Sequence, residues 1–374
     1  MSYSLYIEAV QDFSNRFVKP IAHQVDEEEI FPKETVVEMG NHGLMGITFP
    51  KMYGGMGSTT KAYTDAVRIL SQSCATTGVI LSAHTSLGTH PIAEFGTEEQ
   101  KMKYLPKLCS GEYLGAFGLT EAGAGTDASM QTTKAIDKGD HFLITGSKIF
   151  ITNAGYADIY IIFAMTDATK GIKGISAFII EKDSEGFSVG PKEKKLGIRG
   201  SSTCELIFKD VKVPKENLLG SVGMGFKIAM QTLDGGRIGI AAQALGIAEG
   251  AFDRALTYIK KRKQFNKRIA DFQNTQFAIA EMKTKLEAGR LLLDRAANDK
   301  DQGLPYSMSA AMAKLYNSRI AVEITDQCIQ LLGGYGYIRD YEIERYYRDA
   351  KITEIYEGTS EVQKMVIAGK VINA

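Results

Sequence analysis

A β-rich stretch in the middle of the chain most restricts what this protein can fold into. Between residues 115 and 220, runs rich in β-branched and aromatic residues alternate with turns rich in Gly, Asp and Lys. The runs are residues 141–145, 159–165, 175–181 and 203–214. Because no helix of useful length lies between them, we expect a small antiparallel β-barrel or sandwich.

Helical patterns occupy both sides of this stretch. Residues 5–114 have a helical pattern with turn breaks, and Thr97-Glu-Glu-Gln is a capping-box start for one of the helices. Apolar residues recur at helical spacing in later segments, which are 238–261, 272–299, 310–332 and 362–371. We therefore predict an α+β multidomain protein with three parts. They are an all-helical domain (1–114), a middle antiparallel β-barrel domain (115–220) and a C-terminal four-helix bundle (221–374).

A short segment near the C-terminus carries groups suited to acid–base chemistry. Glu357 lies between Tyr356 and Gly358, and the glycine lets a ligand approach the backbone beside the carboxylate. Residues 359–361 then begin a helical run, whose free N–H groups suit a phosphate or a polarised carbonyl. The same residues are also an ordinary helix N-cap. The segment alone leaves both interpretations open.

The run Ile355-Tyr-Glu-Gly-Thr-Ser-Glu-Val-Gln, with Tyr347-Arg-Asp-Ala-Lys-Ile-Thr before it, resembles a known signature. It is the segment that carries the catalytic glutamate in the acyl-CoA dehydrogenase family of flavoproteins. The order of helices, β-domain and helical bundle is also that family's architecture, and the likeness covers nearly the whole chain. The resemblance implies that Glu357 is the catalytic base and that the cofactor is FAD. It is greatest to bacterial short-chain, butyryl-type members.

Two segments resemble the family's flavin walls, residues 117–127 and 146–155. The resemblance places Leu119 and Thr120 at the pyrimidine side of the flavin. It stacks Phe150 on the ring, where many relatives carry Trp, and directs Thr152 towards N5. The other implied cofactor contacts on this side are Phe117, Gly125, Thr126, Thr359 and Glu361.

Two further segments resemble stretches that reach FAD from a neighbouring subunit. In the first, Arg262 would pair with the pyrophosphate through its planar fork. The other implied contacts across the interface are Phe265, Gln273, Gln330, Gly333 and Gly334. Asn266 and Arg268 stand where the family usually has Gly and Pro, and Asn tolerates the left-handed backbone that a turn requires here.

The segment 233–249 resembles the family's helix along the thioester end of the substrate. It implies that Asp234 and Arg237 contact the acyl-CoA, as the resemblance also does for Thr126, Tyr356 and Gly358. Some branches place their catalytic glutamate immediately before that arginine. This chain has Gly236 there, so the base is left to Glu357.

The reaction implied by the resemblance is α,β-dehydrogenation of a saturated acyl-CoA to the trans-2-enoyl-CoA, or its reverse. Glu357 removes the α-proton, the β-hydrogen leaves as hydride to flavin N5, and hydrogen bonds to the thioester carbonyl stabilise the enolate. The implied partners are an electron-transferring flavoprotein and three further copies of this chain in a homotetramer. The alternatives are a branched short-chain substrate, an acyl-CoA oxidase, or a catalytically inactive binding protein on this scaffold.

Composition narrows the class of protein further. The 44 basic and 44 acidic residues give zero net charge, so we expect no nucleic-acid partner. Residues 69–93 lack charged side chains, but their Ser, Thr and His content predicts a buried helix rather than membrane insertion. The amino terminus lacks a signal-peptide pattern, which predicts a cytoplasmic protein. Four widely spaced cysteines predict reduced thiols and no metal site.

Overall fold

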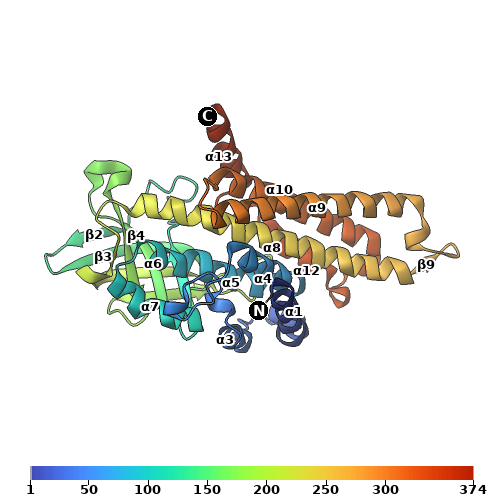
Figure 1. The fold of residues 1–374 in the computed structure, drawn as a ribbon, viewed down its shortest axis with the longest axis horizontal. Coiled ribbons are helices and arrows are strands. Elements are labelled where there is room, and N and C mark those ends of the chain that lie inside the picture. The colour runs from blue at the N-terminus through green and yellow to red at the C-terminus, as the bar shows by residue number, and fades with distance from the viewer. Residues whose placement is uncertain (1, 374) are drawn as a thin grey trace.

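A single long helix, α8 (Gly225–Lys261), connects the β-sheet at one end of the protein to a short hairpin at the other (Figure 1). The computed structural model describes residues 2–373. Helices precede the sheet in the chain, and further helices pack along α8 after it. The predicted order of helices, β-domain and helical domain is confirmed.

The chain up to residue 114 is helical. Its α-helices are α1 (Tyr3–Phe13), α2 (Ala22–Glu27), α3 (Lys33–Asn41), α4 (Thr60–Ser73), α5 (Ala75–Ala83), α6 (His90–Phe95) and α7 (Glu98–Ser110). The predicted capping box is present, because the Thr97 side chain and the Gln100 side chain each accept from the other residue's backbone N–H. Residues 69–93 form buried helices and a π-helical turn, His84–Thr89, as the sequence predicts. No helix within residues 2–373 is long and apolar enough to cross a membrane.

The β-domain is one sheet whose strand order is β6-β7-β3-β2-β4-β5-β8, with β1 also beside β4. The strands are β1 (Gly115–Gly118), β2 (Lys134–Asp137), β3 (His141–Thr152), β4 (Ile159–Met165), β5 (Ile175–Glu181), β6 (Phe187–Lys192), β7 (Thr203–Pro214) and β8 (Leu218–Leu219). Most neighbours are antiparallel, as expected, but β1 and β2 each pair with β4 in parallel. The long connection through β2 and β3 provides the crossover that the β1–β4 pairing needs.

The C-terminal part packs helices against α8. They are α9 (Gln273–Asp301), α10 (Ser307–Leu332), α11 (Gly334–Tyr337), α12 (Ile343–Ile352) and α13 (Ser360–Ile372), and the hairpin strands are β9 (Lys263–Gln264) and β10 (Lys267–Arg268). One apolar core joins α8 to α4, α5, α9, α10 and α12. The sequence pattern started the first of these helices at residue 238, whereas α8 begins at Gly225. Gly235 and Gly236 weaken the pattern, but the buried Ile228 and Ala229 stabilise this part of the helix.

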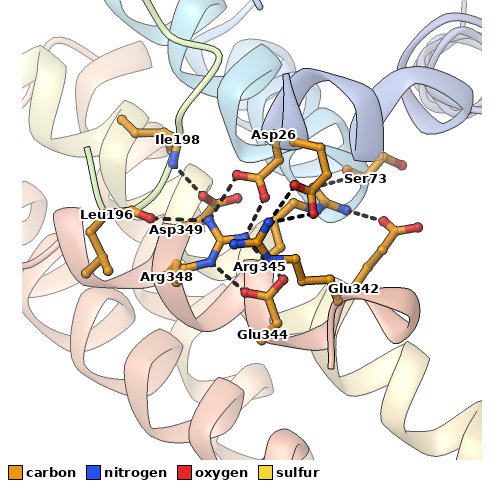
Figure 2. A network of polar contacts seen from close by, with 11 residues as sticks. Asp26, Ser73, Leu196, Ile198, Glu342, Glu344, Arg345, Arg348 and Asp349 are labelled. Atoms are coloured by element: carbon orange, nitrogen blue, oxygen red, sulfur yellow. Dashed lines mark hydrogen bonds and ion pairs between the residues drawn. The ribbon is translucent and has the colours of Figure 1, made fainter. Parts of the chain in front are cut away.

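Two arginines of α12 tie the three parts of the chain together (Figure 2). Arg348 donates to both carboxylate oxygens of Asp26 in α2, at 3.0 and 2.5 Å, and to the Leu196 carbonyl between β6 and β7. Arg345 donates to the Ser73 carbonyl at the end of α4. Asp349 accepts from the backbone N–H of Ile198 at 2.5 Å. We call these groups the arginine network.

Replacing Asp26 with alanine should lower the free energy of unfolding by about 3 kcal/mol, because it leaves a largely buried Arg348 charge with fewer partners. Asp12, which pairs with Arg16 on the surface, is the matched control. Its alanine variant should change stability by less than about 1 kcal/mol. Urea unfolding of both variants measures the difference. Equal unfolding midpoints would contradict a stabilising role for the arginine network.

Candidate active site

A pocket of about 200 Å³ lies where the β-sheet, α5, α8 and the segment between α12 and α13 meet. It brings together eleven of the residues predicted for cofactor, substrate or catalysis. They are Phe117, Leu119, Thr120, Gly125, Thr126, Phe150, Thr152, Arg237, Tyr356, Glu357 and Gly358. Apolar residues of α5 and the turn after it line the pocket as well, Val79, Ala83 and Leu87 among them. Segments far apart in the sequence therefore converge on one site.

Glu357 reaches this pocket from a tight turn. Glu357 and Gly358 both have left-handed backbone, with φ of 52° and 91°. The backbone N–H of Glu357 makes no hydrogen bond to any residue from 2 to 373. Thr359 is the N-cap of α13, and its hydroxyl accepts from the Val362 N–H at 3.4 Å. The two interpretations of this segment are therefore compatible, because the capping group and the candidate base are different residues.

The Glu357 carboxylate has the burial, the free oxygen and the raised pKa that suit a catalytic base. Its Oε2 atom is buried and has no hydrogen-bond partner among the described residues. Burial raises the pKa of Glu357 to about 7, against the lowering effect of the Lys314 and Arg237 charges. The neighbouring helix has no side chain at Gly236, where a Cβ atom would lie 1.9 Å from Oε2. The glycine is required by the position of the carboxylate.

Asp234 and Arg237 form an ion pair one turn apart on α8, at 2.5 Å, and Ser307 donates to the same Asp234 oxygen. Only Arg237 lines the pocket with Glu357, and its buried Nε has no partner within residues 2–373. Asp234 instead lines an adjacent cavity of about 910 Å³, together with His90 and Lys300. The pair thus lies between the carboxylate pocket and a larger cavity.

The predicted flavin walls lie on one side of the pocket. Phe150 has φ of 60° and leaves 62% of its surface exposed, and the Ile149 N–H donates to the Thr120 carbonyl, which joins the two walls. A Cβ atom at Gly125 would meet no described residue within 4 Å, and the φ of Gly125 is not positive. Neither packing nor backbone conformation requires this glycine. Open space beside an exposed aromatic face fits a planar ring.

Sequence reasoning missed a buried ion pair beneath these walls. Lys148 is fully buried and donates to the Glu121 carboxylate at 2.7 Å and to the Leu119 carbonyl at 3.2 Å. Burial alone would raise the pKa of Glu121, but Lys148 and the donors of Thr132 lower it to about 2. The pair holds residues 119–121 in place. A single lysine within a β-strand gave no indication of this pair in the sequence.

The residues predicted to reach FAD from a neighbouring subunit lie elsewhere. Arg262, Gln330, Gly333 and Gly334 line a separate pocket of about 430 Å³ at the far end of α8. Arg262 has no ion-pair partner within the described chain, and a Cβ at Gly333 or Gly334 would meet nothing within 4 Å. These features fit a phosphate-containing ligand. Asn266 has φ of 59°, so the turn expected there is present.

One FAD molecule cannot contact both this pocket and the Glu357 pocket of the same chain. Arg262 follows the last residue of α8, 26 residues after Gly236, which corresponds to about 39 Å along the helix. One FAD molecule does not span that distance in addition to its contacts at each end. The remaining predicted contacts line neither pocket, and they are Phe265, Gln273, Thr359 and Glu361.

Comparison with known proteins identifies the family. Models of the acyl-CoA dehydrogenase N-terminal, middle and C-terminal domains match residues 3–112, 116–211 and 223–372. A short-chain specific acyl-CoA dehydrogenase of Clostridium acetobutylicum is 59% identical over 97% of this chain and 96% of its own. Butyryl-CoA dehydrogenase from Megasphaera elsdenii superimposes with a TM-score of 0.98 at 48% identity, covering 100% of this chain and 99% of that one.

A second solved structure is equally similar. It is described as an electron transferring flavoprotein of Acidaminococcus fermentans, with a TM-score of 0.98, 50% identity and complete coverage of both chains. The domain matches and the full-length identity agree with the signature around Glu357. The chain belongs to the acyl-CoA dehydrogenase family.

Proposed function

We propose that this protein catalyses α,β-dehydrogenation of a short-chain acyl-CoA of the butyryl type, or the reverse reduction, with Glu357 as the base. The observation that carries the proposal is the buried, unpartnered Glu357 carboxylate in a pocket with an exposed aromatic wall. The apolar residues Val79, Ala83 and Leu87 of the pocket suit an acyl chain. The Clostridium acetobutylicum and Megasphaera elsdenii relatives are described as short-chain specific acyl-CoA dehydrogenase and butyryl-CoA dehydrogenase.

The chain's own residues divide the chemical work. Glu357 accepts the α-proton of the thioester, which is acidic enough only when the developing enolate is stabilised. The free backbone N–H of Glu357 donates to the thioester carbonyl, and Arg237 supplies positive charge nearby. Apolar walls exclude water from the reacting carbons. FAD, when bound, supplies the acceptor for the β-hydrogen.

We assign the cofactor contacts to two chains. Phe150, Thr152, Leu119 and Thr120 hold the flavin in one subunit. Arg262 and the Gln330–Gly334 segment of a neighbouring subunit hold the pyrophosphate and adenosine, because one chain cannot place both sets on one FAD. Four further points stay predictions. They are a homotetramer with shared sites, an electron-transferring flavoprotein as electron acceptor, a cytoplasmic location and the domain boundaries at 115 and 221.

An anaerobic visible spectrum, followed during titration with butyryl-CoA, tests the proposed function. We expect a yellow protein that bleaches fully at near-stoichiometric butyryl-CoA. Isobutyryl-, isovaleryl- and octanoyl-CoA are the comparison substrates. Preferential bleaching by a branched thioester would change only the assigned substrate. Rapid reoxidation of the reduced flavin by oxygen would favour an oxidase. A protein purified without FAD would contradict the function.

The pKa of Glu357 predicts the pH dependence of turnover. The base acts when deprotonated, so kcat/KM for butyryl-CoA should be constant above about pH 8 and fall about tenfold per unit below pH 7. Steady-state rates between pH 5.5 and 9 measure this limb, with FAD absorbance recorded at each pH to verify that the cofactor stays bound. A rate that is unchanged down to pH 5.5 would contradict a base with a raised pKa.

A further inference from the structure

Lys314 is a buried lysine on α10 that the proposed mechanism does not use. Its side chain is fully buried, and no carboxylate oxygen of the described residues lies within 4.0 Å of its Nζ. Within residues 2–373, its one hydrogen bond goes to the Gly358 carbonyl, at 2.5 Å. A buried ammonium group without an ion-pair partner lowers the stability of the folded protein, which indicates that Lys314 has a functional role.

The Gly358 carbonyl is part of the turn that presents Glu357. Gln363 of α13 donates to the same carbonyl at 2.8 Å and to the Glu357 carbonyl at 3.4 Å. Lys314 therefore attaches the left-handed pair, Glu357 and Gly358, to α10, and Gln363 attaches it to α13. Two side chains from different helices fix a backbone conformation that a non-glycine residue adopts only with strain.

The charges around the turn give Lys314 a second effect. Four charged or titratable groups face Glu357. They are Lys314 on α10, Arg237 on α8, Tyr63 on α4 and Tyr356, which directly precedes Glu357 in the chain. Of the two cations, Lys314 has the larger lowering effect on the pKa of Glu357. Glu354 and Glu361 also face Lys314. Burial lowers the pKa of Lys314 to about 8, so the group is mainly charged at neutral pH.

We propose that Lys314 is a positioning residue for Glu357. Its ammonium group holds the Gly358 carbonyl, which fixes the turn that directs the carboxylate into the pocket, and its positive charge favours the ionised carboxylate. This inference rests on the proposed function of Glu357 as the base. It adds a residue from α10 to a site otherwise formed by α5, α8, the β-sheet and the turn that carries Glu357.

The test compares three variants of the FAD-loaded protein. Lys314→Met removes the charge and the donor at similar length. Lys314→Gln removes the charge and keeps a donor, and it serves if the methionine variant does not fold. Ser318→Ala is the matched control, because Ser318 lies one turn further along α10 and donates to the Thr353 carbonyl at 2.7 Å without carrying a charge.

The carboxylic acid band of Glu357 is identified by infrared difference spectra between the wild type and Glu357→Gln, recorded without substrate. We expect the midpoint of this band to rise by about one pH unit in both Lys314 variants and to stay unchanged in Ser318→Ala. The acidic limb of kcat/KM should move by the same amount. In Lys314→Met, kcat on the high-pH plateau should also fall about tenfold because the turn is less fixed.

A midpoint in both Lys314 variants that matches the wild type would overturn the proposal. A shift of equal size in Ser318→Ala would overturn it too, because any lost bond between α10 and this part of the chain would then explain the effect. Failure of the proposed function is a different result. It would appear as turnover retained by Glu357→Gln, whereas the infrared midpoint depends only on the coupling between Lys314 and Glu357.

Discussion

Glu357→Gln is expected to lower kcat with butyryl-CoA by about 10⁴-fold or more while FAD stays bound. A neutral amide cannot accept the α-proton, and no other carboxylate lines the pocket among the described residues. The fold should be unaffected, because the replaced Oε2 atom has no hydrogen-bond partner to lose. Dye-linked turnover and the visible spectrum of the purified variant measure the two effects.

Stability gives an independent measurement on the same variant. The pKa of Glu357 is raised in the folded protein, so its side chain contributes most to folding when it is protonated, below its unfolded pKa of about 4.5. That contribution is lost as the pH rises through 7. The stability of Glu357→Gln relative to the wild type should therefore increase between pH 5 and pH 8, as urea unfolding can show.

Glu354→Gln is the matched control for both measurements. Glu354 lies three residues earlier, pairs with Lys351 at 2.6 Å and does not line the pocket. Its variant should keep turnover within about twofold of the wild type. The assignment of the base fails if Glu357→Gln keeps more than a tenth of the wild-type kcat.

Gly236→Ala is expected to lower kcat at least about 100-fold without unfolding the protein. The added Cβ would lie 1.9 Å from Oε2 and 2.9 Å from Cδ of Glu357, so the carboxylate must move out of its position. Alanine is the better helix former by about 1 kcal/mol, which offsets part of the strain. Steady-state kinetics and circular dichroism distinguish lost activity from lost structure.

The adjacent residue of the same helix supplies the control. A Cβ at Gly235 would meet only the end of the flexible Lys300 side chain, at 3.2 Å. Gly235→Ala carries the same change in helix propensity and should keep most of the wild-type kcat. Equal losses in the two variants would show that α8 needs flexibility here rather than space for Glu357.

Local pattern predicted much of the fold. The runs 159–165, 175–181 and 203–214 coincide with β4, β5 and β7, because β-branched and aromatic residues bounded by turn residues specify a strand locally. The apolar spacing placed the start of this helix at residue 238, whereas α8 begins at Gly225, because Gly235 and Gly236 interrupt the spacing and packing against the sheet stabilises the earlier turns. Parallel pairing of β1 with β4 depends on contacts between distant segments, which local pattern does not contain.

For the candidate site too, local motifs predicted one set of residues and missed another. Motifs identified the residues that line the Glu357 pocket, because each motif carries its own chemistry. The supporting lysines were not predicted. Lys148 and Lys314 are fully buried, but a single lysine in a strand or helix gives no indication in the sequence that it is buried. Their partners are a carboxylate and a backbone carbonyl that only the fold brings near.

The packing of α4 against α8 also bears on how the protein is made. Nearly every residue of α4 is buried, and its main partner is α8, which follows some 150 residues later in the chain. During synthesis, the N-terminal helices therefore leave the ribosome long before the surface that covers them. Such late pairing slows folding and exposes apolar surface meanwhile. Substitutions in α4 should therefore increase chaperone dependence during translation, in addition to lowering the stability of the folded protein.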